Sequence, residues 1–246
     1  MTNWHKYSLS KGGYGHVASS RPAAVGINGM VASAHPLASM AGLDVLKDGG
    51  NAFDAVVTTA STLGVVESYM SGLGGVGVAV LNIASENRVR TLDFSGRMPS
   101  ASKPSVFSDE TKDHGILASL IPGNLAGWLK LHEEYGSFDL KRLFAPAISY
   151  AQNGFPVTHM ANGVMSGAAH CLEPFPSSKK IILGSSNSVP LAGSILKMPE
   201  LAESYRTVAE DGGDAFYRGD LASRIVKGNN DYGGIFTADD MASYKA

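Results

Sequence analysis

The sequence predicts a helix-rich α+β fold, and three features of the 246-residue chain support that class. Residues 36–68 carry apolar side chains near helical spacing, interrupted by Gly49-Gly50, which indicates two successive helices. Residues 76–94 contain two extended runs around a short polar turn, as is typical of a β-hairpin. From Pro122 onward the pattern is mainly helical. With 44% hydrophobic and 17% charged residues, the chain is long enough and apolar enough to bury a sizeable core.

The first two helices have marked boundaries. Residues 36–50 are expected to form a helix that ends at Gly49-Gly50, because glycine readily adopts the left-handed conformation of helix ends. Asn51 is expected to cap a second helix over residues 52–68. The apolar stripe of this second helix consists of Phe53, Val56, Val57, Ala60 and Leu63.

A β-hairpin is expected after the glycine-rich segment 71–77. Residues 76–83 form an extended apolar run, and Ser85-Glu86-Asn87 resembles a turn. In residues 88–94 the apolar side chains alternate imperfectly with polar ones; these apolar residues are Val89, Leu92 and Phe94. The two runs are therefore predicted to pair as antiparallel strands.

The helices that follow are predicted from their caps and stops. Asn124 is expected to cap a helix that ends at Gly136. Residues 139–153 are expected to be helical, with Pro146 restarting the helix. Residues 174–199 are rich in Pro, Ser and Gly and are expected to form a loop or a domain edge.

Three further elements are expected near the C-terminal end. Pro199 is expected to start a helix, and residues 220–228 to form a short one. Thr237 and Asp240 have the spacing of a helix capping box.

Composition and charge exclude several classes of function. Lys and Arg total 20 against 22 Asp and Glu, so the charge gives no electrostatic reason to expect nucleic acid as a partner. The single cysteine, Cys171, excludes an intrachain disulfide, and a small buried residue is its expected role. Residues 1–20 lack the apolar core of a secretory signal, and no run approaches a membrane span, so a cytoplasmic protein without membrane association is expected.

Two motifs suggest chemistry that their context does not support. Gly72, Gly74 and Gly77 satisfy the dinucleotide-binding pattern, but that site needs a strand before the glycines and a helix after them. Here a helix precedes and a strand follows, so a tight turn is expected. The seven histidines include no pair at helical spacing, and no metal or other cofactor is expected.

Nucleophile and anion-binding candidates are few. Removal of Met1 would leave Thr2 as an N-terminal nucleophile, but it lies in a polar segment without strand character. A Ser-His-Asp triad stays open, although no elbow motif around a serine points to one.

Arg97 follows a predicted strand in a Gly- and Pro-punctuated turn, where a guanidinium is able to bind a carboxylate through two hydrogen bonds. The alternative is a solvated turn arginine, and Asp93 is placed either to pair with it or to cap the turn.

Several motifs together resemble the gamma-glutamyltransferase family, also called gamma-glutamyltranspeptidases or glutathione hydrolases. Residues 30–75 contain a GGNA-DA segment followed by a GVVE…SG-GG segment, which are the hallmark of that family. Further segments agree in order: LDFSGRMP at 92–99, PGNLAGWLKLHEEYG at 122–136, APAISYAQNGFPV at 145–157, and GGIFTADDMASY near the end. The resemblance implies an N-terminal extension at 1–23 and an incomplete large-subunit portion at 24–246.

The resemblance also implies a fold and an activity. The expected fold is the αββα sandwich of N-terminal-nucleophile hydrolases, of which this chain supplies a partial, helix-rich portion. Family members cleave themselves into a large and a small subunit, which form a heterodimer. The new N-terminal Thr of the small subunit transfers or hydrolyses γ-glutamyl amides such as glutathione. No Thr-Thr-His processing segment is present, so no catalytic residue is expected within this chain.

One family residue falls within the chain. The family arginine that holds the α-carboxylate of the donor occurs in an LDFRE-type segment, where this sequence has Ser95, and Arg97 follows two residues later. Ser95 and Arg97 are therefore the expected substrate-binding residues. The alternatives are a related amidohydrolase or acylase with a non-glutamyl substrate, or a non-catalytic truncated domain.

Overall fold

The structure, a computed structural model, describes residues 24–184 and 186–246. The chain divides into two units, Met1–Met30 and Val31–Ala246. The described part of the first unit, residues 24–30, is exposed and contains no helix or strand. All elements discussed below lie in the second unit.

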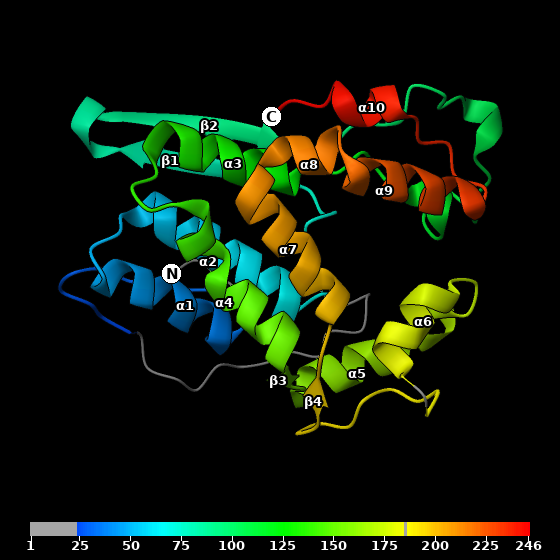
Figure 1. The fold of residues 1–246 in the computed structure, drawn as a ribbon, viewed down its shortest axis with the longest axis horizontal. Coiled ribbons are helices and arrows are strands. Elements are labelled where there is room, and N and C mark those ends of the chain that lie inside the picture. The colour runs from blue at the N-terminus through cyan, green and yellow to red at the C-terminus, as the bar shows by residue number, and fades with distance from the viewer. Residues whose placement is uncertain (1–23, 185) are drawn as a thin grey trace, which may run out of the picture. The chain divides into compact units, whose positions relative to one another are not determined.

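The second unit is helix-rich with a small strand content, which confirms the α+β class (Figure 1). The α-helices are α1 (Pro36–Lys47), α2 (Ala52–Val66), α3 (Asn124–Tyr135), α4 (Leu140–Asn153), α5 (His159–Ala168), α6 (Pro176–Leu183), α7 (Pro199–Asp211), α8 (Gly213–Tyr217), α9 (Asp220–Asp231) and α10 (Ala238–Ala242). The strands are β1 (Gly77–Ile83), β2 (Arg88–Phe94), β3 (Phe155–Pro156) and β4 (Ile195–Leu196), paired as β1–β2 and β3–β4. Short 3-10 turns are η2 (Ala84–Glu86), η3 (Pro104–Val106), η4 (Ile116–Ala118) and η5 (Ala169–Leu172).

Helix α2 is central to the core and packs against α1, α3 and α4, while α4 also packs against α7. Its buried side chains are mostly small, including Thr58, Ser61 and Thr62, which allow neighbouring helices to approach closely. An apolar stripe ordinarily faces the core, yet here Val57 is fully buried while Val56 is 45% exposed. The periodicity therefore identified the helix correctly but indicated a face that is only partly covered.

The N-terminus of α2 is held by a predicted cap. The Asn51 side chain accepts hydrogen bonds from the amides of Phe53 and Asp54, and Asp54 in turn accepts one from the Asn51 amide at 2.9 Å. This reciprocal capping box satisfies helix donors that would otherwise be unpaired.

The predicted β-hairpin is confirmed, with Val80 opposite Thr91 in an antiparallel register. One face packs on α3, where Gly127 lets the helix backbone approach Phe94, since a Cβ at Gly127 would lie 2.3 Å from the Phe94 ring. Val78, Val80 and Val89 lie on the opposite face and are 71%, 75% and 64% exposed. Val89 thus points away from the side that Leu92 and Phe94 share.

Two helix boundaries differ from the expectation. Gly123 rather than Asn124 is the N-cap of α3, because the Asn124 side chain instead donates a hydrogen bond to the Gly72 carbonyl at 2.9 Å. Helix α4 continues through Pro146 without a restart. Proline removes one helical hydrogen bond, but Leu143 and Ala147 on either side of it are fully buried, and their packing keeps the helix continuous.

The region from 155 to 199 is more ordered than expected. Helix α5 was not anticipated, and residues 174–199 contain α6 and β4 rather than loop alone. Cys171 is exposed, so its expected burial is wrong. The predicted start of α7 at Pro199 and the capping box of Thr237 with Asp240 are confirmed. None of the helices in the described part of the chain combines the length and the apolar composition that a membrane span requires.

Candidate functional site

The glycine-rich segment joins α2 to β1 and has no nucleotide-site geometry, because the helix precedes it and the strand follows it. Its carbonyls bind the start of α3 instead. The Gly75 carbonyl accepts hydrogen bonds from the amides of Gly123 and Asn124, each at 2.9 Å. These contacts use donors at the α3 N-terminus that a phosphate would need, so the turn interpretation agrees with the structure.

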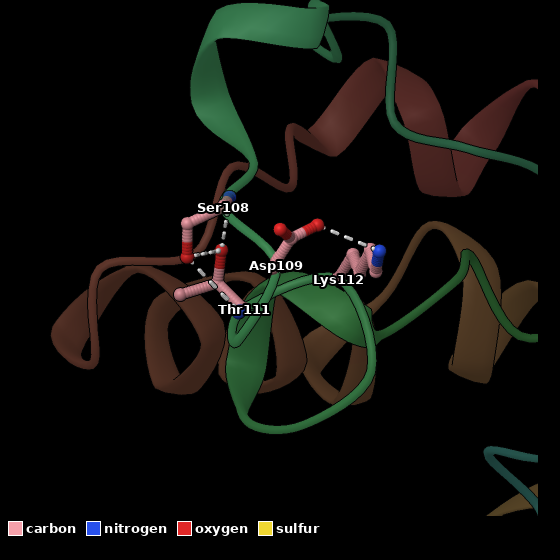
Figure 2. A network of polar contacts seen from close by, with 4 residues as sticks. All are labelled: Ser108, Asp109, Thr111 and Lys112. Atoms are coloured by element: carbon pink, nitrogen blue, oxygen red, sulfur yellow. Dashed lines mark hydrogen bonds and ion pairs between the residues drawn. The ribbon is translucent and has the colours of Figure 1, made fainter.

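An exposed polar network at the turn around Ser108 also lacks the features of a site (Figure 2). The Ser108 and Thr111 hydroxyls lie 3.1 Å apart, each accepts from the other residue's amide, and Lys112 pairs with Asp109 at 2.8 Å. The Asp109 side chain is 99% exposed. Because these groups satisfy one another in solvent, the network is a turn cap.

The arginine loop, residues 95–100, begins where β2 ends at the buried Phe94. Its first residue is fixed by Asp93, whose Oδ1 accepts a hydrogen bond from the Ser95 amide at 2.9 Å. Hydrogen bonds from the Ser95 side chain and amide hold the pKa of Asp93 below its usual value. Of the two roles open to Asp93, the structure therefore supports capping the turn.

Gly96 allows the loop to turn back toward the core. Its φ of +83° is in the left-handed region that favours glycine, and its amide donates a hydrogen bond to the Tyr244 hydroxyl at 3.3 Å. A Cβ at this position would lie 2.7 Å from the Val76 side chain and 2.9 Å from the Ile121 carbonyl oxygen. A side chain at position 96 would therefore be unfavourable for two reasons, the left-handed backbone conformation and the overlap with Val76 and Ile121.

Arg97 is anchored by its backbone and exposed at its side chain. Its carbonyl accepts a hydrogen bond from the amide of buried Ile121 at 2.8 Å, in an isolated antiparallel bridge. The guanidinium carbon lies 5.6 Å from the centre of the Tyr244 ring, within the range of a cation–π contact. Across the described residues, Arg97 forms no ion pair with an acidic side chain. Its donors are thus available for a carboxylate.

The two expected site residues share this loop but differ in surroundings. Both Ser95 and Arg97 are exposed, and the Ser95 hydroxyl hydrogen-bonds to Asp93 while Arg97 lies over Tyr244. Sequence reasoning missed Tyr244 as part of the site. It lies 148 residues from Gly96, and no local pattern connects the two segments.

In the described part of the chain, no cluster of three His, Cys, Asp or Glu side chains is placed to hold a metal ion. His35 caps α1 through its ring nitrogen Nδ1, and burial lowers its pKa. Thr2, His5 and His16 lie outside the described residues.

The sequence matches the family described as gamma-glutamyltranspeptidase over residues 38–246. The chain is 34% identical over 232 residues to the glutathione hydrolase proenzyme of Bacillus subtilis (strain 168), covering 89% of this chain and 38% of the relative. It is 32% identical over 241 residues to glutathione hydrolase 3 of Arabidopsis thaliana, covering 97% and 37%. The chain therefore spans less than two fifths of these two relatives.

Solved structures agree with the sequence matches. The Helicobacter pylori gamma-glutamyltranspeptidase superposes with a TM-score of 0.87 at 32% identity, covering 91% of this chain and 66% of that one. The cephalosporin acylase from Bacillus halodurans superposes with a TM-score of 0.82 at 30% identity, covering 94% and 46%.

Proposed function

Because this chain belongs to the gamma-glutamyltranspeptidase family, we propose that it is the large-subunit portion of an enzyme that transfers or hydrolyses γ-glutamyl amides such as glutathione. The observation that carries the proposal is the continuous family match over residues 38–246, together with the TM-score of 0.87 to a gamma-glutamyltranspeptidase. The relatives called proenzymes support a precursor that is cleaved into subunits. In this proposal the nucleophilic Thr belongs to the small subunit, outside residues 1–246.

Arg97 is the proposed contact for the α-carboxylate of the donor. Its guanidinium is exposed on a loop whose backbone is fixed at Ile121, and it has no acidic partner among residues 24–184 and 186–246. A guanidinium binds a carboxylate through two parallel hydrogen bonds, a geometry that the single ammonium group of lysine does not offer. Ser95 contributes by its bond with Asp93, which shapes the start of the loop.

The rest of the protein is proposed to complete an αββα sandwich on the hairpin. A two-stranded sheet is marginally stable by itself. The exposed Val78, Val80 and Val89 make the outer face of the hairpin partly apolar, between the polar Asn82, Thr91 and Asp93, and so suited to contact with a second sheet. Residues 24–246 would then be an incomplete domain that follows an extension at 1–23. The small subunit is the proposed occupant of that face, as the partner in a heterodimer.

A second candidate function is an acylase with a non-glutamyl substrate. It is favoured by the 30% identity to the cephalosporin acylase over 94% of this chain, and by Ser95 at the position of the family arginine. The two functions differ in their need for an α-carboxylate on the acyl group. Comparing γ-glutamyl-p-nitroanilide with butyryl-p-nitroanilide, which lacks both the α-amino and the α-carboxylate groups, distinguishes them.

The principal experiment compares this chain with a longer protein that includes the downstream coding region. The 246-residue chain is expected to be inactive on γ-glutamyl-p-nitroanilide. The longer protein is expected to cleave itself into two fragments, seen as two bands on a denaturing gel, and to hydrolyse the donor. In the longer protein, Arg97→Ala should raise KM by about tenfold or more, because a charged hydrogen bond is lost. Turnover by the verified short chain would overturn the placement of the nucleophile.

A further inference from the structure

The arginine loop is held at both ends by one distant segment, residues 240–244. The Gly96 amide donates to the Tyr244 hydroxyl at 3.3 Å, and the Ser100 amide donates to Asp240 Oδ1 at 2.9 Å. Figure 1 shows this C-terminal segment, in red, running from α10 toward the end of β2. The two contacts flank Arg97, so they restrict the part of the loop that presents the guanidinium.

Tyr244 is itself fixed in the core. It is 7% exposed, and its ring stacks on Tyr217 with centroids 5.8 Å apart and planes 11° apart. The Tyr217 hydroxyl donates to the Pro122 carbonyl at 3.0 Å and accepts from the Ala126 amide at 3.1 Å. Burial raises the pKa of Tyr217, so its hydroxyl keeps the proton that it donates.

These contacts connect the backbone and the side chain of Arg97 through a continuous series of neighbouring residues. Ile121, which pairs with the Arg97 backbone, directly precedes Pro122, to which Tyr217 is bonded. Tyr217 supports the Tyr244 ring, and that ring faces the Arg97 guanidinium. The backbone of Arg97 is therefore held by Ile121, and its side chain is supported through Tyr244 and Tyr217 by the adjacent Pro122.

Asp240 joins the loop to the cap of α10. Its Oδ2 accepts from the Thr237 amide at 3.0 Å and from the Thr237 hydroxyl at 2.7 Å, while Oδ1 remains for Ser100. Burial alone would raise the pKa of Asp240, but the hydrogen bonds from Thr237 and Ser100 hold it below its usual value. The carboxylate is thus ionised near neutral pH and serves both segments.

We propose that Tyr244 is a positioning residue that orients Arg97 for the carboxylate of an acyl donor, with Asp240 as a second anchor of the loop. The inference rests on the proposed function of Arg97. The two parts of Tyr244 have separate tasks: the hydroxyl fixes the loop backbone at Gly96, and the ring supports the guanidinium. A guanidinium held against a ring keeps its N–H donors free at its edge, where a carboxylate binds in two places.

The test uses the catalytically complete longer protein and two donors, γ-glutamyl-p-nitroanilide and 4-aminobutyryl-p-nitroanilide, which lacks the α-carboxylate. Tyr244→Leu should raise KM for the first donor by about tenfold, with kcat within about twofold and KM for the second donor unchanged. In an Arg97→Ala background, Tyr244→Leu should add no further rise. Tyr232→Leu is the matched control, since Tyr232 is 39% exposed and packs on Phe175 instead.

The outcomes separate the two proposals. If Arg97→Ala raises KM and Tyr244→Leu does not, the positioning role is overturned and the carboxylate contact stands. If Arg97→Ala leaves KM unchanged, the proposed role of Arg97 fails, and a remaining effect of Tyr244→Leu then excludes an action through Arg97.

A second measurement covers the case in which Tyr244→Leu does not fold. In the 246-residue chain, Tyr244→Phe keeps the ring and removes the hydroxyl, so hydrogen exchange at the Gly96 amide should speed up by about tenfold while the Ser100 amide keeps its protection. Unchanged exchange at Gly96 overturns the role given to the Tyr244 hydroxyl.

Discussion

Asp54 accepts hydrogen bonds from both the amide and the hydroxyl of Ser137, which ties the N-terminus of α2 to the turn between α3 and α4. The amide bond is 2.9 Å long, and the Phe138 amide adds a third contact at 3.3 Å. Asp54 is fully buried, and it also completes the capping box with Asn51. One carboxylate thus joins local helix capping to tertiary packing across 83 residues.

Asp54→Asn should lower the free energy of unfolding by about 1–3 kcal/mol, because an amide cannot accept all the hydrogen bonds that the carboxylate receives. Urea denaturation followed by circular dichroism measures the change. The matched control is Asp48→Asn, whose exposed carboxylate pairs with Arg142 and should contribute about 1 kcal/mol or less. Equal effects of the two variants would contradict the structural role of Asp54.

The same carboxylate predicts a pH dependence. Burial raises the pKa of Asp54, but the hydrogen bonds from Ser137, Asn51 and Phe138 outweigh it and hold the pKa below its usual value. Its stabilisation is therefore complete above the unfolded pKa of about 3.9 and is lost as the pH falls through the folded value. The urea midpoint of the wild-type chain should fall more steeply below about pH 4 than that of Asp54→Asn. Parallel pH curves would exclude this linkage.

Helix α2 shows what periodicity can and cannot predict. Its N-cap, Asn51, and its approximate length were predicted, because a cap depends on residues next to the helix in the sequence. Its buried face was predicted only in part: Val57 of the apolar stripe is buried, but polar Thr58 and Thr62 are buried as well, through close helix packing that the stripe does not indicate. The apolar stripe containing Val56 faces a side that the described residues leave partly open.

The residues of the candidate site also fall into those that the sequence predicts and those that it does not. Ser95 and Arg97 were predicted because they follow a strand in a recognisable motif. Tyr244 and Asp240 were not, because their bonds to the loop join residues 148 and 140 positions apart. The packing of α8 on α3 and of α10 on α9 brings these segments together.

Two helical glycines should respond oppositely to alanine. Gly127→Ala should destabilise the chain by about 1–3 kcal/mol, because the new Cβ would overlap the Phe94 ring. Gly163→Ala in α5 should stabilise it by about 0.5–1 kcal/mol, because nothing lies within 4 Å of the new Cβ and alanine favours the helix. Thermal unfolding of both variants checks the pair. A stabilising Gly127→Ala would show that the hairpin does not pack on α3 as described.

The buried hydroxyl of Tyr205 should contribute measurably to the packing of α7 on α2. It donates to the Ser61 carbonyl at 2.9 Å and is fully buried, and burial raises its pKa, so it stays protonated. Tyr205→Phe should cost about 0.5–1.5 kcal/mol, because one intramolecular hydrogen bond is lost. Tyr232→Phe on the surface should have little effect. Similar unfolding free energies for wild type and Tyr205→Phe would exclude a net contribution from this bond.

The exposed face of the hairpin should behave differently in the short and the long protein. Val80 is 75% exposed here, so Val80→Asn should change the stability of the 246-residue chain by less than about 0.5 kcal/mol. If the small subunit covers this face, the same change in the longer protein should cost about 1–3 kcal/mol, because the amide is then buried without a partner. Met160→Asn, at a site on α5 that is 55% exposed, is the control. Thermal unfolding of both proteins gives the comparison, and equal small effects of Val80→Asn in both would place the partner elsewhere.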